Sequence, residues 1–140
     1  MLPALQLLLP TAVPIHHLGL FREPTTLSPV EYYNNLPYHR PTPANPSNKS
    51  ASKLAILLDP VIATGGTCAA AIQTLREWGV ERVVVIAVLG AVEGVERAAR
   101  EWQEGTEIWI AGVDEAINEK GMIIPGVGDV GDRLFLTIGK

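Results

Sequence analysis

The sequence predicts an α/β fold built on a parallel β-sheet. Between residues 53 and 111, apolar runs typical of buried strands alternate with segments of helical periodicity. Both helical segments end at a glycine, the residue most common just past a helix C-terminus. This order of strand, helix, strand, helix and strand indicates parallel strands joined by right-handed crossovers.

Length and composition predict one globular domain, 1–140, with a core of its own. The chain has 140 residues, of which 47% are hydrophobic and 19% are charged. Its net charge of −4 argues against binding to nucleic acid or to a membrane surface. The single cysteine, Cys68, cannot form an internal disulfide, so a reducing, cytoplasmic location is expected. No apolar run approaches the roughly 18 residues of a membrane helix.

The first 52 residues predict little regular structure. Residues 1–10, "MLPALQLLLP", lack a basic leader, so we interpret them as the tail of a core helix and not as a signal peptide. Residues 13–21 form a plausible first strand. Residues 22–52 are rich in Pro, Asn, Ser and Thr, and the prolines interrupt any regular helix. A protruding arm or hairpin with a flexible tip near residues 38–52 is expected there.

The segment 53–111 supplies the βαβαβ core. Residues 53–59 and 81–90 are continuous apolar runs, as expected of strands buried on both faces, and residues 107–112 form the third strand. The two helices are predicted at 68–79 and 92–105. The first carries a buried stripe of Ala71, Ile72, Leu75 and Trp78, and the second a stripe of Val92, Val95, Ala99 and Trp102. Residues 112–140 are expected to form a loop followed by a short strand.

A small-residue loop follows the first core strand. Asp59 lies at the end of that strand, where ligands of open parallel sheets bind. The loop Ala63–Thr67 contains two adjacent glycines and leads into a helix N-terminus, whose free N–H groups favour an anion. The alternative is a tight turn with Thr67 as the helix N-cap. The loop alone leaves both interpretations open, and Asp59 shortly before it favours a phosphate site.

Other motifs are weaker. A Walker loop needs a lysine that this chain does not place after Gly66. The pattern G-x-G-x-x-G at residues 126–131 does not open a crossover helix, so we reject it as a dinucleotide fingerprint. Its glycines and aspartates form either a solvated turn or a loop whose backbone groups bind a planar polar ring. No histidine or cysteine spacing predicts a metal site.

The sequence resembles the uracil phosphoribosyltransferase family. "LLDPVIATGGT" (57–67) looks like that family's phosphoribosyl-pyrophosphate loop, and "INEKGMIIPGVGDVGDRLF" (117–135) resembles its uracil-binding tail. "HLGLFREPTTLSPVEYYNNLP" (17–37) resembles the strand and arm that precede the loop, and "AVLGAVEGVERA" (87–98) resembles a later segment. The resemblance implies a type I phosphoribosyltransferase-like, Rossmann-like domain, with the arm at 22–52, the core at 53–111 and the uracil-binding tail at 112–140.

The resemblance implies transfer of the phosphoribosyl group from phosphoribosyl pyrophosphate to uracil, giving UMP and pyrophosphate in pyrimidine salvage. Asp59 and Asp129 are the residues expected to act in the reaction, with Mg²⁺ on the pyrophosphate as cofactor. The donor-binding residues that it implies are Arg22, Asp59, Ala63, Thr64, Gly65, Gly66, Thr67 and Asp129. Those implied for uracil are Ile123, Gly128, Asp129 and Val130. The resemblance leaves open a GTP effector and a homo-oligomer formed through residues 29–33, and an arm folded onto its own sheet is the alternative to that oligomer.

The sequence also departs from the family. The family's N-terminal part carries an arginine loop for pyrophosphate that does not occur in this chain, so an N-terminally truncated domain is expected. Met122, Val92 and Leu136 stand where tyrosine, proline and glycine are usual. The alternative function is therefore a truncated, non-catalytic homologue that binds nucleotide or a partner.

Overall fold

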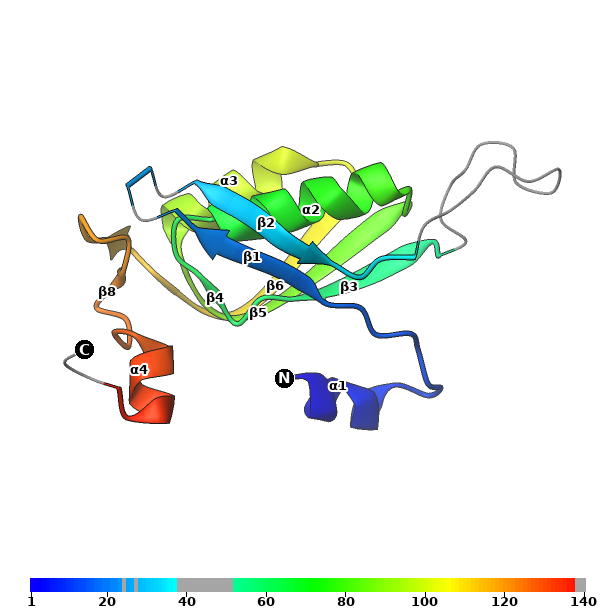
Figure 1. Cartoon of the computed structure of the whole chain (residues 1–140), viewed down its shortest axis with the longest axis horizontal. Helices are drawn as coiled ribbons and strands as arrows, with labels where there is room; N and C mark the ends of the chain where they lie inside the picture. Colours follow the sequence, from blue (N-terminus) through cyan, green and yellow to red (C-terminus); the bar gives the residue numbers. More distant parts are fainter. Residues whose placement is uncertain (24, 27, 38–51, 138–140) are drawn as a thin grey trace, which may run out of the picture.

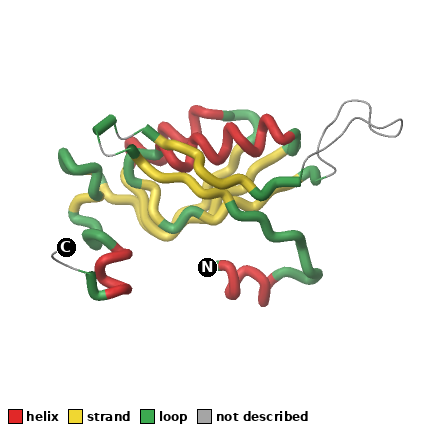
Figure 2. The backbone as a smooth tube through the Cα atoms, viewed as in Figure 1, coloured by secondary structure: helices red, strands yellow, loops and turns green. Residues whose placement is uncertain are grey.

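The computed structural model describes residues 1–23, 25–26, 28–37 and 52–137, without the side chain of Arg22. Figures 1 and 2 show a β-sheet with two helices packed along it, a hairpin beside one of them, and short helices near both ends of the described chain. The elements, in chain order, are α1 (Leu2–Leu8), β1 (Leu18–Arg22), β2 (Pro29–Asn34), β3 (Leu54–Leu58), β4 (Val61–Ile62), α2 (Gly66–Trp78), β5 (Arg82–Ala91), α3 (Val92–Glu101), β6 (Thr106–Asp114), β7 (Ala116–Ile117), β8 (Ile123–Ile124) and α4 (Val130–Phe135). Every helix among the described residues is too short or too polar to cross a bilayer.

The central sheet is parallel, as predicted. The long strand β5 pairs with β3 and β4 along one edge and with β6 along the other. In the register, Leu57 lies opposite Val85, and Val85 lies opposite Ile108. The carboxyl ends of these strands therefore meet at one edge of the sheet, and the loops that leave them are neighbours.

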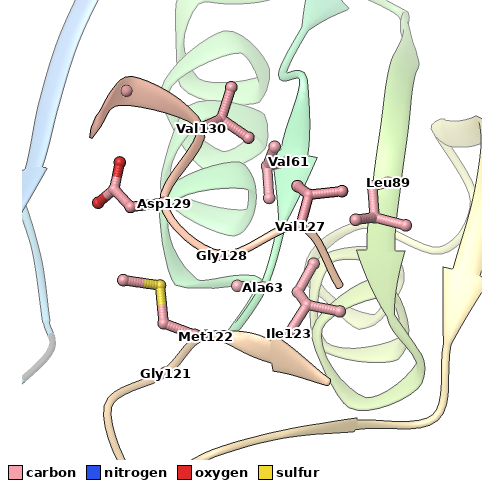
Figure 3. Close-up of a pocket in the computed structure, with 11 residues that line it drawn as sticks. Val61, Ala63, Leu89, Gly121, Met122, Ile123, Val127, Gly128, Asp129 and Val130 are labelled. Carbon is pink, nitrogen blue, oxygen red and sulfur yellow. The ribbon is translucent and has the colours of Figure 1, made fainter. Parts of the chain in front are cut away.

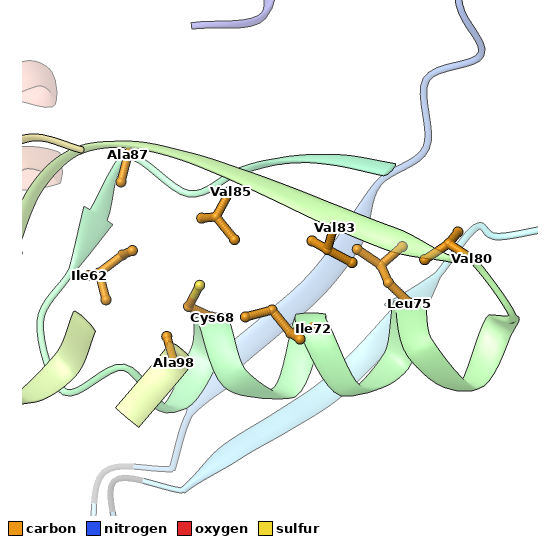
Figure 4. Close-up of a cluster of buried hydrophobic side chains, with 9 residues drawn as sticks. All are labelled: Ile62, Cys68, Ile72, Leu75, Val80, Val83, Val85, Ala87 and Ala98. Carbon is orange, nitrogen blue, oxygen red and sulfur yellow. The ribbon is translucent and has the colours of Figure 1, made fainter. Parts of the chain in front are cut away.

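The core lies between this sheet and the helices α2 and α3. From β5, Val83, Val85 and Ala87 point toward the helices, and they are at most 4% exposed. Ile72 of α2 is fully buried against them, together with Cys68. Figure 4 shows these side chains meeting in one layer between the strand and the helix.

The other face of the sheet corrects the prediction of strands buried on both faces. On that face, Leu54 is 50% exposed, Val88 52% and Trp109 62%. The chain adds its strands in one direction, β3, then β5, then β6, and two right-handed crossovers made in one direction place both helices on the same face. Figure 1 shows α2 and α3 together on that one face.

The helix α3 buries a different stripe from the predicted one. Gly94 and Ala98 are its buried residues, whereas Val92 is 45% exposed. Val95 and Trp102, also part of the predicted stripe, are partly buried against the core. The smallest side chains of α3 therefore make its closest approach to the rest of the domain.

The N-terminal region contains a helix and a hairpin. The helix α1 exists, but the prediction that it belongs to a core is wrong, because it has no buried residue and Leu7 and Leu8 are 87% and 82% exposed. The first strand starts at Leu18, later than predicted, and pairs with β2 in an antiparallel hairpin. The predicted tip of the arm lies outside the described residues, apart from Ser52.

The hairpin packs against α2 of its own chain. Thr74 Oγ1 donates a hydrogen bond of 3.3 Å to the carboxylate of Glu31. Trp78 Nε1 donates one of 2.9 Å to the carbonyl oxygen of Pro37, just beyond the hairpin. Tyr32 and Tyr33 stay 71% and 50% exposed. The arm thus contacts a helix on the covered side of the sheet and keeps its aromatic side chains in solvent.

The C-terminal region differs from the predicted loop and strand. The small hairpin of β7 and β8 follows β6, and the last described element is the helix α4, where a short strand was expected. The carboxylate of Asp129 accepts a hydrogen bond of 2.9 Å from the backbone N–H of Asp132 and so caps α4. An N-cap of this kind favours a helix over an extended segment.

Candidate functional site

The phosphate-type loop lies at the carboxyl end of β3, as predicted. Asp59 follows β3 directly, is half-buried, and is fixed by its backbone N–H, which donates to the carbonyl oxygen of Ile86 at 3.2 Å. After the short strand β4, the chain turns at Ala63–Gly65 and enters α2 at Gly66. The structure therefore places Asp59 and the loop side by side at one edge of the sheet.

The start of α2 argues against the simple turn. Its N-cap is Gly65, at φ +73°, and Thr67 is the second residue of the helix, so the alternative of Thr67 as N-cap is wrong. A glycine N-cap has no side-chain oxygen to accept hydrogen bonds from the first backbone N–H groups of the helix. Those N–H groups have no carbonyl partner within a helix, and together with the helix dipole they favour an anion.

A small cavity of about 30 Å³ opens inside this loop. All the residues that line it come from the segment between β3 and the first turn of α2. They are Asp59, Val61, Ile62, Ala63, Thr64, Gly65, Thr67 and Cys68. The cavity is thus lined by a carboxylate-bearing residue, two threonines and the glycine of the loop, the residues that the sequence assigned to ribose and phosphate.

Cys68 is one of the residues that line the small cavity. It is 1% exposed, and burial, aided by the negative charge of Asp59, raises its pKa to about 12. A thiol with this pKa stays protonated at neutral pH and is a poor nucleophile. Cys68 therefore acts in packing, which agrees with its interpretation as a small helix residue.

A second, larger cavity lies between the loop and the C-terminal tail. Its volume is about 230 Å³, below the roughly 300–1,000 Å³ of pockets for drug-sized ligands, so it suits a small ring. The tail contributes Gly121, Met122, Ile123, Val127, Gly128, Asp129, Val130 and Gly131, and the sheet side contributes Val61, Ala63 and Leu89. Figure 3 shows the aliphatic side chains of Val61, Leu89 and Val127 gathered on one side of this cavity.

The tail contains all four residues predicted to contact the ring. Ile123 is 8% exposed and packs against Ala63 and Ala91, which joins the tail to the sheet. Gly128 and Asp129 are exposed and Val130 is half-buried, all at the rim of the same cavity. The structure thus brings the predicted ring contacts together.

Asp114 holds the tail in place and was missed by the sequence analysis. It ends β6, and its carboxylate oxygen Oδ2 accepts a hydrogen bond of 3.0 Å from the partly buried N–H of Gly126. Gly126 itself has φ +49°, and a Cβ there would lie 2.3 Å from the carbonyl oxygen of Ile123, so only glycine fits this turn. The sequence did offer a signal for Asp114, because it is an acidic residue only two positions beyond the predicted end of the third strand.

Asp129 has two roles in this arrangement. Its carboxylate caps α4, and the residue also lines the larger cavity. In Figure 3 its carboxylate points away from Val61 and Leu89. For Arg22 the structure gives the backbone alone, as the last residue of β1 opposite Pro29.

The two cavities are adjacent because Val61 and Ala63 line both of them. A molecule with its phosphate in the loop would therefore extend toward a ring held by the tail. Among the described residues, no three His, Cys, Asp or Glu side chains form a group that could hold a metal ion. The arrangement thus places a helix start that favours an anion next to a cavity of the size of a small ring.

Comparisons with known proteins agree with this geometry. The family model for uracil phosphoribosyltransferase matches residues 1–137. The chain is 43% identical over 130 residues to the uracil phosphoribosyltransferase of Roseiflexus castenholzii, which covers 93% of this chain and 57% of that protein. It is 42% identical over 123 residues to the one from Thermus thermophilus, covering 88% of this chain and 54% of that protein.

A solved structure gives the same result for the fold. The AQ2163 protein from Aquifex aeolicus superposes with a TM-score of 0.71 at 35% sequence identity, over 86% of this chain and 52% of that one. The chain thus spans about half the length of the relatives that it matches.

Proposed function

Because the chain belongs to the uracil phosphoribosyltransferase family, we propose that its site serves the transfer of a phosphoribosyl group from phosphoribosyl pyrophosphate to uracil. The products would be UMP and pyrophosphate. The observation that carries the proposal is the pair of adjacent cavities, one within the loop after β3 and one beneath the tail, which share Val61 and Ala63. A transfer reaction needs its two substrates side by side, and these cavities offer that arrangement.

In this proposal the loop binds the donor. The backbone N–H groups at the start of α2, with the hydroxyls of Thr64 and Thr67, hold the 5-phosphate. Asp59, half-buried at the end of β3, accepts hydrogen bonds from the ribose hydroxyls. The family resemblance implies that Arg22 belongs to the pyrophosphate side of the donor site.

The tail binds uracil in the larger cavity. The backbone of Ile123 and of Gly128–Val130 hydrogen-bonds the polar edge of the ring, and the aliphatic groups of Val61 and Leu89 cover its face. Such a site discriminates strongly, because a ring with the wrong donors and acceptors leaves buried polar groups unpaired. Asp129 borders the ring cavity, and in this proposal its negative charge acts on the sugar of the bound donor.

The chemistry needs positioning more than a nucleophilic side chain. Breaking the bond between C1 and pyrophosphate builds positive, oxocarbenium-like charge on the ribose, and the carboxylates of Asp59 and Asp129 would stabilise it. Mg²⁺, bound to the donor, would neutralise the leaving pyrophosphate. Mg²⁺ commonly uses one or two carboxylates plus substrate phosphates, so in this proposal the cation arrives with the donor.

The experiment is a direct assay. The chain is incubated with uracil, phosphoribosyl pyrophosphate and Mg²⁺, and UMP is separated by chromatography. Formation of UMP that depends on all three components supports the proposal. Gly65→Val should remove it, because a Cβ there would lie 2.1 Å from the carbonyl oxygen of Gly94 and would displace the loop. If no UMP forms but calorimetry shows UMP binding, the chain is a binding homologue. Absence of both, with folded protein, refutes the site.

Two further expectations remain predictions. A homo-oligomer through residues 29–33 would use side chains that stay exposed on the hairpin, including Tyr32 and Tyr33. Equilibrium sedimentation of the wild type and of Tyr32→Ser tests it. A GTP effector is tested by adding GTP to the same transfer assay.

A further inference from the structure

We propose that Gly94, in the first turn of α3, is a positioning residue that sets the shape of the phosphate loop. The inference rests on the proposed function only for the identity of the ligand. Its basis is a backbone contact between α3 and the loop, which neither the predicted helical stripe nor the loop motif includes.

The contact is reciprocal and unusually close. A Cβ built on Gly94 would lie 2.0 Å from the carbonyl oxygen of Ala63 and 3.0 Å from the backbone nitrogen of Gly65. A Cβ built on Gly65 would lie 2.1 Å from the carbonyl oxygen of Gly94. Ordinary contacts between a carbon and a carbonyl oxygen are about 3.3–3.6 Å. The loop and α3 therefore touch backbone to backbone, and a side chain at either position would force them apart.

Arg97, almost one turn further along α3, extends this contact. Its Nη1 donates a hydrogen bond of 3.4 Å to the carbonyl oxygen of Thr64. The same guanidinium lies 3.4–3.6 Å from the place where a Cβ of Gly66 would be. Helix α3 thus contacts four successive loop positions, 63 to 66. The small cavity is lined by residues of the β3–α2 segment, so α3 supports the loop from behind.

The expected sign follows from comparing two effects. Inside a helix, alanine is more favourable than glycine by a factor of about five, so helix propensity alone predicts that Gly94→Ala stabilises α3. The added Cβ, however, requires the contact between α3 and the loop to widen by about 1.3–1.6 Å to restore ordinary distances. A misplacement of about 1 Å can cost about 100-fold in the rate of a reaction that depends on position, and here the shift also moves the groups that hold the phosphate. We therefore expect weaker phosphate binding from a substitution that favours the helix.

The test compares Gly94→Ala with Gly112→Ala. Gly112, in β6, is a matched control, because a Cβ there would meet its nearest atoms at 3.7 and 4.0 Å, which are ordinary contacts. Ribose 5-phosphate is titrated into each protein by calorimetry, and the backbone amide resonances of residues 63–67 are followed by NMR. Gly94→Ala should bind at least tenfold more weakly, with shifted loop resonances and unchanged resonances at Gly128 and Val130. Gly112→Ala should match the wild type.

The variant Arg97→Gln keeps the test decisive if Gly94→Ala does not fold, because it adds no atoms to the contact. It should weaken ribose 5-phosphate binding about two- to fivefold and shift the resonances of Thr64 and Gly66. A folded Gly94→Ala protein with wild-type affinity and loop resonances would overturn the inference. If Gly94→Ala is unfolded, an Arg97→Gln protein with wild-type affinity and wild-type loop resonances would also overturn the inference. If wild-type protein does not bind ribose 5-phosphate, the proposed function fails, and the loop resonances alone decide the positioning role.

Discussion

Asp129 can be tested with two substitutions that separate its structural and chemical roles. Its carboxylate caps α4 through a 2.9 Å hydrogen bond from the N–H of Asp132, and it also borders the ring cavity. Asparagine is as good an N-cap as aspartate but carries no charge, whereas alanine neither caps nor carries charge. Asp129→Asn should therefore keep α4 but slow turnover, and Asp129→Ala should both weaken α4 and slow turnover.

The magnitudes follow from the exposure of this helix. The cap is exposed, so its loss should cost about 1 kcal/mol, a factor of about five in the population of α4. Helix α4 has six residues and buries none of them, so little packing offsets that loss. Hydrogen bonds to a charged group contribute about 1.5–3 kcal/mol, so loss of the charge should slow turnover by about 10- to 150-fold.

The assay combines the rate of UMP formation with the backbone carbon shifts of residues 130–135, which report helix content. Asp129→Asn should show wild-type shifts and a reduced rate, and Asp129→Ala should show reduced helix content as well. Full helix content in Asp129→Ala would refute the capping argument. A wild-type rate in Asp129→Asn would remove Asp129 from the reaction and leave it a structural residue.

Three other perturbations follow from the structure. Asp114→Ala leaves the N–H of Gly126 without its partner, at a cost of about 1–3 kcal/mol. UMP should therefore bind about 5- to 150-fold more weakly by calorimetry, whereas binding of ribose 5-phosphate to the loop should be unchanged. Leu136→Gly should slow hydrogen exchange at Thr137, because a leucine at φ 54° and ψ 40° costs about 1 kcal/mol that glycine avoids, and faster exchange would contradict this. The thiol pKa of Cys68 is raised to about 12 in the folded chain, from about 8.5 when unfolded. Its contribution to stability is complete below about pH 8.5 and is lost as pH rises toward 12, so the free energy of urea unfolding should fall more steeply above pH 9 in the wild type than in Cys68→Ala.

The parallel core was predictable because its signals are local. The apolar runs that became β3 and β5, and the helical periodicity between them, follow directly from neighbouring residues. Burial was less predictable, since which face of a strand is covered depends on the direction in which later strands are added. Leu54 and Val88 belong to apolar runs and are still half exposed, because both crossovers cover the opposite face.

The misplaced stripe of α3 has a different physical cause. Hydrophobic periodicity favours large side chains such as Val92, whereas the closest contact of α3 uses Gly94, which has no side chain to detect. A backbone contact of this kind depends on a loop about 30 residues earlier. Asp114 is a similar case: its place just past the third strand was visible, but its partner Gly126 lies 12 residues away and does not follow from neighbouring residues. The short strand predicted in the tail was wrong for a related reason. An apolar segment after Asp129 resembles a strand, and only the capping contact of Asp129 shows that it starts a helix.

The central position of β5 has a consequence for how the molecule opens. This strand is hydrogen-bonded on both sides, to β3 and β4 and to β6, and its inward side chains are almost fully buried. Its amide protons should therefore exchange with solvent only when the whole domain unfolds, whereas the loop and the tail can open while β5 stays intact. The ligand-holding parts would then be the first to fluctuate. A bound ligand should protect them long before it changes the slowest-exchanging amides of the core.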